Sequence, residues 1–225
     1  MDNQDTFDFG GMGESFQPED FVFDETPAET QDRYCKPCIH HKMSIKAKHA
    51  ADLVKNLAIG KNESVYAFLS GRFIFGDFLE QWIEAHNIGV KKMHLATLSM
   101  SAENVMSLAG LIERGFIQEL DLHISIYFYA HERHVLIPMI YSELDQDDKF
   151  QLVVSAIHSK ICLIETVGGK FITIHGSANL RSSDNVEQIQ ITENKELYDF
   201  NAQYLDELKQ RYKTINKPVR GKQMP

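Results

Sequence analysis

Short segments with a strand-like pattern alternate with segments of helical pattern along most of this sequence, and this order limits the fold more than any other feature. Strands are expected at 64–69, 90–98, 119–129, 150–156, 158–165, 170–175 and 187–192, and helices at 44–58, 76–87, 101–115, 130–146 and 196–213. Alternating strands and helices that end in a hairpin favour a mixed β-sheet flanked by helices. The fold class predicted from this order is therefore α/β.

Several of these elements carry more detailed expectations. Ser101 is expected to cap the helix 101–115, and Pro138 is expected to kink the helix 130–146. The first helix should place four side chains near one face: Ile45, His49, Leu53 and Leu57. The strand 119–129 should direct four others to one side of the sheet: Leu120, Leu122, Ile124 and Ile126.

The apolar content is sufficient for a sizeable core without a membrane segment. Of 225 residues, 43% are hydrophobic, which suits one large domain or a domain with an appendage. The longest apolar runs fall far below the roughly 18 residues that cross a bilayer, and the N-terminus has no basic start or apolar signal core. Three cysteines, two of them in one C-x-x-C, do not suggest a secreted disulfide framework. We therefore expect a soluble, cytoplasmic protein with no membrane partner.

The negative charge is concentrated at the N-terminal end. The chain has a formal net charge of −9, but residues 1–32 contain 10 of its 32 acidic residues and none of its 23 Lys and Arg residues, so the rest carries 22 acidic and 23 basic residues and is +1. We expect 1–32 to be a disordered tail. It is either a solubilising leader or an arm that docks its aromatic side chains on a protein partner or on the chain's own body: Phe7, Phe9, Phe16, Phe21 and Phe23.

The expected organisation follows from these observations. The tail 1–32 is followed by a connector at 33–43 that is rich in Cys and His, then by the folded domain at 44–215 and a C-terminal tail at 216–225. In the connector, "YCKPCIHHK" groups four residue types that bind zinc: Cys35, Cys38, His40 and His41. A structural zinc is one interpretation of this group, and free cytosolic cysteines are the other.

Polar side chains are grouped around the hairpin expected at 158–175. In a strand from 158, His158 and Lys160 would share a face with Cys162 and Ile164, whereas Glu165 would face the other side. The return strand ends at "GSAN", which should bring Ser177 and Asn179 close to His158 and Lys160. An imidazole, an ammonium, a hydroxyl and an amide around one turn suit the binding of a phosphate oxyanion.

These residues form a pattern that resembles the signature of the phospholipase D superfamily, H-x-K-x4-D followed by G-S-x-N. Five residues match it position by position: His158, Lys160, Gly176, Ser177 and Asn179. Glu165 stands where the family usually has Asp, and we expect it to have a structural role. Glu187 resembles the downstream acid with which some members orient the catalytic imidazole. The strand and helix order is also similar to that of the family's fold.

The resemblance implies a metal-independent phosphodiesterase with a phosphohistidine intermediate. One histidine attacks the phosphodiester and a second protonates the leaving oxygen, while Lys160, Asn179 and Ser177 hold the non-bridging oxygens. Because the chain has one motif, the resemblance implies a homodimer in which each chain contributes its His158 to a shared cleft. No cofactor is required.

Nucleic acid, DNA or RNA, is the expected substrate, since small single-motif members without a secretion signal are more often nucleases than lipid-directed enzymes. Arg72, which follows a strand and a glycine, and Arg181, two residues after Asn179, are candidates for binding substrate phosphates, as is Gly176 through its backbone. The nearly neutral body lacks the basic patch typical of nucleic-acid binding. Two alternatives therefore remain: a catalytically inactive binding protein on the same fold, and a phosphodiesterase directed at phospholipids.

Overall fold

The computed structural model describes residues 33–70, 73–145, 148–181 and 185–213. One mixed sheet of 8 strands organises these residues, in the order β1-β2-β8-β7-β6-β3-β4-β5. The strands are β1 (His40–Ala47), β2 (Glu63–Leu69), β3 (Val90–Thr97), β4 (Leu120–Ser125), β5 (Phe150–Ser155), β6 (Ile161–Thr166), β7 (Phe171–Gly176) and β8 (Glu187–Glu193). The predicted α/β class with a mixed sheet is confirmed.

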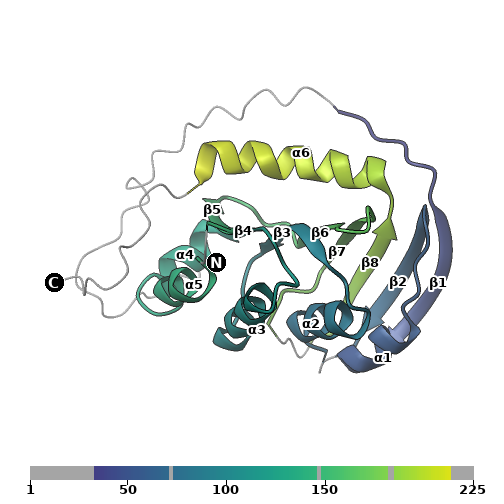
Figure 1. Ribbon diagram of the computed structural model, residues 1–225, viewed down its shortest axis with the longest axis horizontal. Coiled ribbons are helices and arrows are strands. Elements are labelled where there is room, and N and C mark those ends of the chain that lie inside the picture. The colour runs from purple at the N-terminus through teal and green to yellow at the C-terminus, as the bar shows by residue number, and fades with distance from the viewer. Residues whose placement is uncertain (1–32, 71–72, 146–147, 182–184, 214–225) are drawn as a thin grey trace, which may run out of the picture. The chain divides into compact units, whose positions relative to one another are not determined.

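Helices cover the two faces of the sheet unequally, as Figure 1 shows. One face carries α1 (Ala50–Asn56), α2 (Phe75–Ala85), α3 (Ala102–Glu113), α4 (Ile126–Glu132) and α5 (Leu136–Leu144), and the other carries α6 (Lys195–Tyr212). Among the helices in the described ranges, none is both long enough and apolar enough to cross a membrane.

The larger core lies between the sheet and the helices α1 to α5. Alternate strand residues point into it, among them Val65, Leu95 and Cys162, and α2 contributes Phe78 and Trp82, whose rings stack at 5.6 Å. A smaller core lies between α6 and the opposite face, where Leu163 packs with Tyr198 and Leu205. Because strand side chains alternate, β3 and β6 supply both cores, with Leu95 and Cys162 on one face and Ala96 and Leu163 on the other.

Several expected elements are confirmed closely. Ser101 caps α3, and its side-chain oxygen accepts a hydrogen bond from the backbone N–H of Asn104 at 3.4 Å. The hairpin β6–β7 turns at 167–170, and Gly169 supplies the positive φ of 78° that the turn needs. β6 also alternates as expected, with Cys162 and Ile164 in the larger core and Leu163 in the smaller one.

The expected first helix is wrong over its first part. His40–Ala47 forms the edge strand β1, which pairs in parallel with β2, and α1 begins only at Ala50. In β1 the exposed Ser44 and Lys46 alternate with the more buried Ile45 and Ala47, a period of two that one helical face through Ile45 does not describe. His40 and His41, expected in a connector, therefore lie in the sheet.

The region after β4 also differs from the expectation. β4 ends at Ser125, whose side chain caps α4, so Ile126 is helical and does not continue the strand alternation. The expected single helix at 130–146 is two helices, and the break at 133–135 precedes Pro138. Pro138 lies in the first turn of α5, where its missing N–H breaks no helical hydrogen bond, so it produces no kink.

Candidate functional site

The sheet topology brings the residues of the motif to one edge. β2, β3 and β7 run in one direction while β6 and β8 run in the other. The ends of β2 at Leu69, of β3 at Thr97 and of β7 at Gly176 therefore share an edge with the starts of β6 and β8. We call this the carboxyl edge, and the segments 156–160, 177–181 and 185–186 lie there.

The "GSAN" turn is tied to β8 and β6 by its backbone. Gly176 N donates to Lys160 O at 3.3 Å and Ser177 N donates to Gln188 O at 2.9 Å. The Ser177 hydroxyl oxygen accepts from Gln188 N at 3.0 Å. A Cβ on Gly176 would lie 2.0 Å from Gln188 O, so only glycine allows this close approach of the two strands.

Asn179 is held by the end of β3. Its Oδ1 accepts from Leu98 N at 3.1 Å and from the Thr97 hydroxyl at 3.5 Å. The next residue, Leu180, donates its N–H to the Thr97 hydroxyl at 3.4 Å and accepts from Gly76 N at 3.1 Å. The turn is thus fixed to both β3 and α2, and the amide group of Asn179 has a defined orientation.

His158 and Lys160 lie in the segment that precedes β6. The expected strand from 158 is wrong at its start, because β6 begins at Ile161, so strand alternation does not orient these two side chains. His158 is exposed and Lys160 is half-buried, and the Lys160 ammonium donates to the backbone oxygen of His158 at 3.5 Å. The Lys160 ammonium therefore lies against the backbone of His158 at the carboxyl edge, in the segment whose Lys160 oxygen accepts from Gly176 N of the "GSAN" turn.

The two acids of the pattern lie at opposite ends of the sheet. Glu165 is near the far end of β6, where it accepts from the Lys91 ammonium at 2.7 Å and raises the pKa of Lys91 through this hydrogen bond. Glu187 is the first residue of β8 and lies at the carboxyl edge, where it is half-buried. Glu165 is thus separated from His158 by the length of β6, and Glu187 shares its edge.

The remaining candidates are placed as follows. Arg181 is exposed just after the "GSAN" turn, and Arg72 lies outside the described residues. Cys38 Sγ lies 4.0 Å from His40 Nε2, whereas His41 Nε2 lies 3.2 Å from the Ser44 hydroxyl. Cys35 is a free thiol whose pKa is raised by burial and then by Glu196. Zinc binding by Cys35, Cys38, His40 and His41 stays a prediction.

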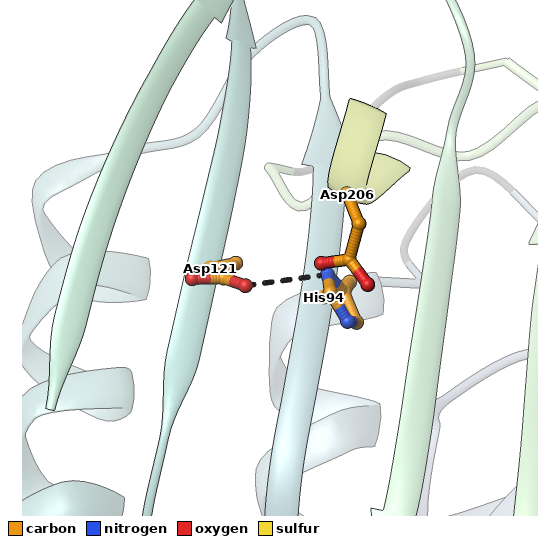
Figure 2. Close-up of side chains that lie close together, drawn as sticks. All are labelled: His94, Asp121 and Asp206. Carbon is orange, nitrogen blue, oxygen red and sulfur yellow. Dashed lines mark ion pairs between the residues drawn. The ribbon is translucent and has the colours of Figure 1, made fainter. Parts of the chain in front are cut away.

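Sequence reasoning missed a polar cluster beneath α6, in which His94 and Asp121 are buried and Asp206 is partly exposed. Figure 2 shows His94 of β3, Asp121 of β4 and Asp206 of α6, and the ligand atoms of these three residues lie within 4.8 Å of one another. His94 Nδ1 is 3.5 Å from an oxygen of Asp121. The signal in the sequence is a polar residue at alternate positions of otherwise apolar strands, in "KMHLA" and "LDLHIS".

Two lysines neutralise the carboxylates of this cluster. Lys209 of α6 donates to both oxygens of Asp121 at 2.7 and 2.8 Å, and Lys92 lies 3.5 Å from both Asp121 and Asp206. The ammonium groups pair with the carboxylates, so the cluster is an ion-pair network that joins α6 to the sheet. Breaking it would leave the buried Asp121 partly uncompensated.

Two buried histidines adjoin this network, and both are held in the neutral form. His94 and His123 are 1% and 0% exposed, with ring centroids 6.2 Å apart. Burial lowers the pKa of His123 to about 3, with a further contribution from His94, and burial and then Lys92 lower the pKa of His94. Neither ring has the exposure of His158.

Comparisons with known proteins identify no family for this chain. No protein-family model matches it, and no curated protein matches it. Among solved structures it is similar to Nuc from Salmonella typhimurium, a phospholipase D family member, at 16% identity and a TM-score of 0.41 over 55% of this chain and 78% of that one.

A second similar structure is TrmBL2, an archaeal chromatin protein with a novel mode of DNA binding. Its identity is 12% and its TM-score 0.45, over 72% of this chain and 57% of that one. At these scores neither likeness carries information about the activity of this chain, which must be argued from its own residues.

Proposed function

We propose that the chain is a metal-independent phosphodiesterase with the phospholipase D type of site, and that nucleic acid is its substrate. The observation that carries this proposal is the meeting of the two halves of the motif at the carboxyl edge, where Gly176 N donates to Lys160 O. His158 and Lys160 belong to the segment on one side of this contact, and Ser177 and Asn179 belong to the turn on the other side, which hydrogen bonds to β8, the end of β3 and α2 hold in place.

The hydrogen bonds of the turn leave donors for a phosphate. The Oδ1 of Asn179 is engaged by Leu98 N, so the amide group has its N–H donors to offer a substrate. The Ser177 oxygen accepts from Gln188 N, which leaves the hydroxyl hydrogen to donate. With the Lys160 ammonium, these donors suit the non-bridging oxygens, whose charge must be stabilised in the transition state.

The reaction proceeds in two displacements. A ring nitrogen of His158 attacks phosphorus, the P–N bond forms, the bridging P–O bond breaks, and a second histidine gives its proton to the leaving oxygen. Water then attacks phosphorus, the P–N bond breaks, and the second histidine takes the proton from water. The second histidine is the partner chain's copy of residue 158, and Glu187 orients the imidazole.

The test is a panel of labelled DNA, RNA and a small chromogenic phosphodiester, incubated in EDTA with the full-length protein. Wild type should turn over at least one substrate, and His158→Ala should reduce turnover by roughly a thousandfold or more, because it removes the nucleophile. His131→Ala, which removes an exposed histidine of α4, is the matched control and should match wild type. Equal inertness of wild type and His158→Ala would leave the alternative, a binding protein without catalysis.

The panel also includes a phospholipid, since a lipid-directed phosphodiesterase would use the same chemistry. Faster turnover of the lipid than of either nucleic acid would reassign the substrate but keep the mechanism.

A further inference from the structure

The half of the α6-side sheet face formed by β1, β2 and β8 is a separate surface from the half on which α6 packs. α6 packs on β5, β6 and β7. On β1, β2 and β8, cross-strand pairing places the buried Ser64 and Thr192 on this same side, together with a set of exposed or half-buried side chains: Ser44, Lys46, Tyr66, Phe68, Gln188 and Gln190. We call this set the open sheet face.

The open sheet face presents aromatic and basic side chains. Phe68 is 46% exposed, and its ring meets that of Tyr66 edge-on at 5.2 Å. Lys46 is exposed and is the cross-strand partner of Phe68, and Gln188 is the partner on the other side. The set contains no Asp or Glu, although the whole chain is acidic. A large exposed ring suits the stacking of a nucleotide base, and the ammonium beside it suits the phosphate of that nucleotide.

The open sheet face continues into a hollow at the carboxyl edge. The hollow has a volume of about 560 Å³ and is lined by Lys46, Ala47, Lys48, Phe68, Leu69, Ser70 and Val186. β2 and β6 are separated by three strand steps through β8 and β7, a lateral distance of about 14 Å at the usual strand spacing. A strand of nucleic acid with a base on Phe68 is thus a few nucleotides from the segment that carries His158.

We propose that the open sheet face binds single-stranded nucleic acid and feeds it toward His158, with Phe68 stacking a base and Lys46 and Lys48 contacting phosphates. This inference rests on the proposed function. Stacking also resolves the lack of a large basic patch, because base-aromatic contacts supply affinity that a nearly neutral body does not.

The test measures the affinity of full-length protein for a fluorescein-labelled oligothymidylate by anisotropy, in the His158→Ala background so that the probe survives. Phe68→Ala should weaken binding by about fivefold or more, and Phe68→Tyr, which keeps a stacking ring, should restore it. Lys46→Glu should weaken binding and reduce its salt dependence. The matched controls are Tyr204→Ala, an equally exposed ring on α6, and Lys170→Glu, at the opposite edge; both should bind like the background protein.

The outcomes separate this inference from the proposed function. Unchanged affinity in both Phe68→Ala and Lys46→Glu overturns the inference about the open sheet face, whether or not the wild-type protein hydrolyses a substrate. Selective loss of affinity in these variants supports it even if the wild-type protein hydrolyses no substrate of the panel. That failure would contradict the proposed nuclease reaction, and the function left would be the binding of single-stranded nucleic acid.

Discussion

Gly176 shows how a single residue shapes the candidate site. It ends β7, and its backbone approaches Gln188 and Ile189 so closely that a methyl group has no space. The same approach lets Ser177 exchange hydrogen bonds with Gln188 and so fixes the "GSAN" turn. In this chain the packing of β7 against β8 therefore requires the glycine of the motif, independently of any contact with a phosphate.

Gly176→Ala should lower the free energy of unfolding by about 1–3 kcal/mol, because the new Cβ would lie 2.0 Å from Gln188 O and 2.8 Å from the Ile189 Cα. Gly168→Ala is the control, since a Cβ there would meet only the Thr166 hydroxyl oxygen at 3.9 Å. Urea unfolding measures both, and equal stability of the two variants would contradict the close approach.

At this scale the sequence was informative because the motif depends on spacing. His158 and Lys160 are two residues apart, and the hairpin that returns to Ser177 was visible from the turn glycines and the alternation of β6. The strand start at 158 was wrong, because the hydrogen bonds that begin β6 at Ile161 depend on neighbours β3 and β7, which are distant in the sequence or across the turn.

Among the elements, α6 depends unusually on polar contacts. It buries only Tyr198 and Leu205, and it adds Lys209 to the buried carboxylate of Asp121. α2 buries six residues, so the apolar contact of α6 is the smaller of the two and the ion pair adds to it.

Lys209→Ala should cost about 1–3 kcal/mol of unfolding free energy, because Asp121, whose side chain is 6% exposed, would lose its two hydrogen bonds at 2.7 and 2.8 Å and keep only longer contacts of 3.5 Å with Lys92 and His94. Lys195→Ala on the same helix should cost less than about 1 kcal/mol, since its ion pair with Asp199 is exposed. Chemical denaturation of both variants measures the difference. A loss in Lys209→Ala no larger than that in Lys195→Ala would contradict the anchoring role.

The buried histidines predict a loss of stability in acid. The pKa of His123 is lowered from 6.5 to about 3 in the folded state by burial, so the unfolded chain binds a proton first. The resulting decrease in the free energy of unfolding is absent well above pH 6.5, grows as the pH falls, and is complete below about pH 3. Besides burial, four groups act on this ring: His94, Asp121, Lys209 and Lys92.

As the pH falls from 6.5 to 4, the free energy of unfolding should therefore decrease less in His123→Leu than in wild type. The other histidines and the carboxylates contribute equally in both proteins. Urea denaturation at several pH values measures this difference. The exposed His131→Leu is the control and should follow the wild-type curve. A His123→Leu curve parallel to that of wild type would contradict the buried neutral histidine.

Element types were largely predictable, but their neighbours were not. The helix α3, its Ser101 cap and the hairpin follow from local patterns. The edge strand β1 was missed because Ile45 and His49 suit a helical spacing, and its pairing with β2 decides otherwise. The polar cluster beneath α6 also needs the strand order, which places His94 opposite Asp121 although they are distant in the sequence.

For the whole molecule, the proposed reaction requires two copies of His158. We expect a homodimer about a two-fold axis, and light scattering in solution should give twice the chain mass of 25.8 kDa. A strictly monomeric protein that retains full turnover would contradict a cleft shared by two chains.

The most direct measurement of the central claim is the identification of the covalent intermediate. Full-length protein is mixed briefly in EDTA with a phosphodiester that it hydrolyses. The reaction is quenched in alkali to preserve a phosphohistidine, and the protein is digested and analysed by mass spectrometry. The proposed mechanism predicts an adduct carrying the phosphoryl half of the substrate on the peptide that contains His158, and its absence in His158→Ala. Turnover that persists in His158→Ala, or an adduct on a different residue, would contradict the assignment of His158 as the nucleophile.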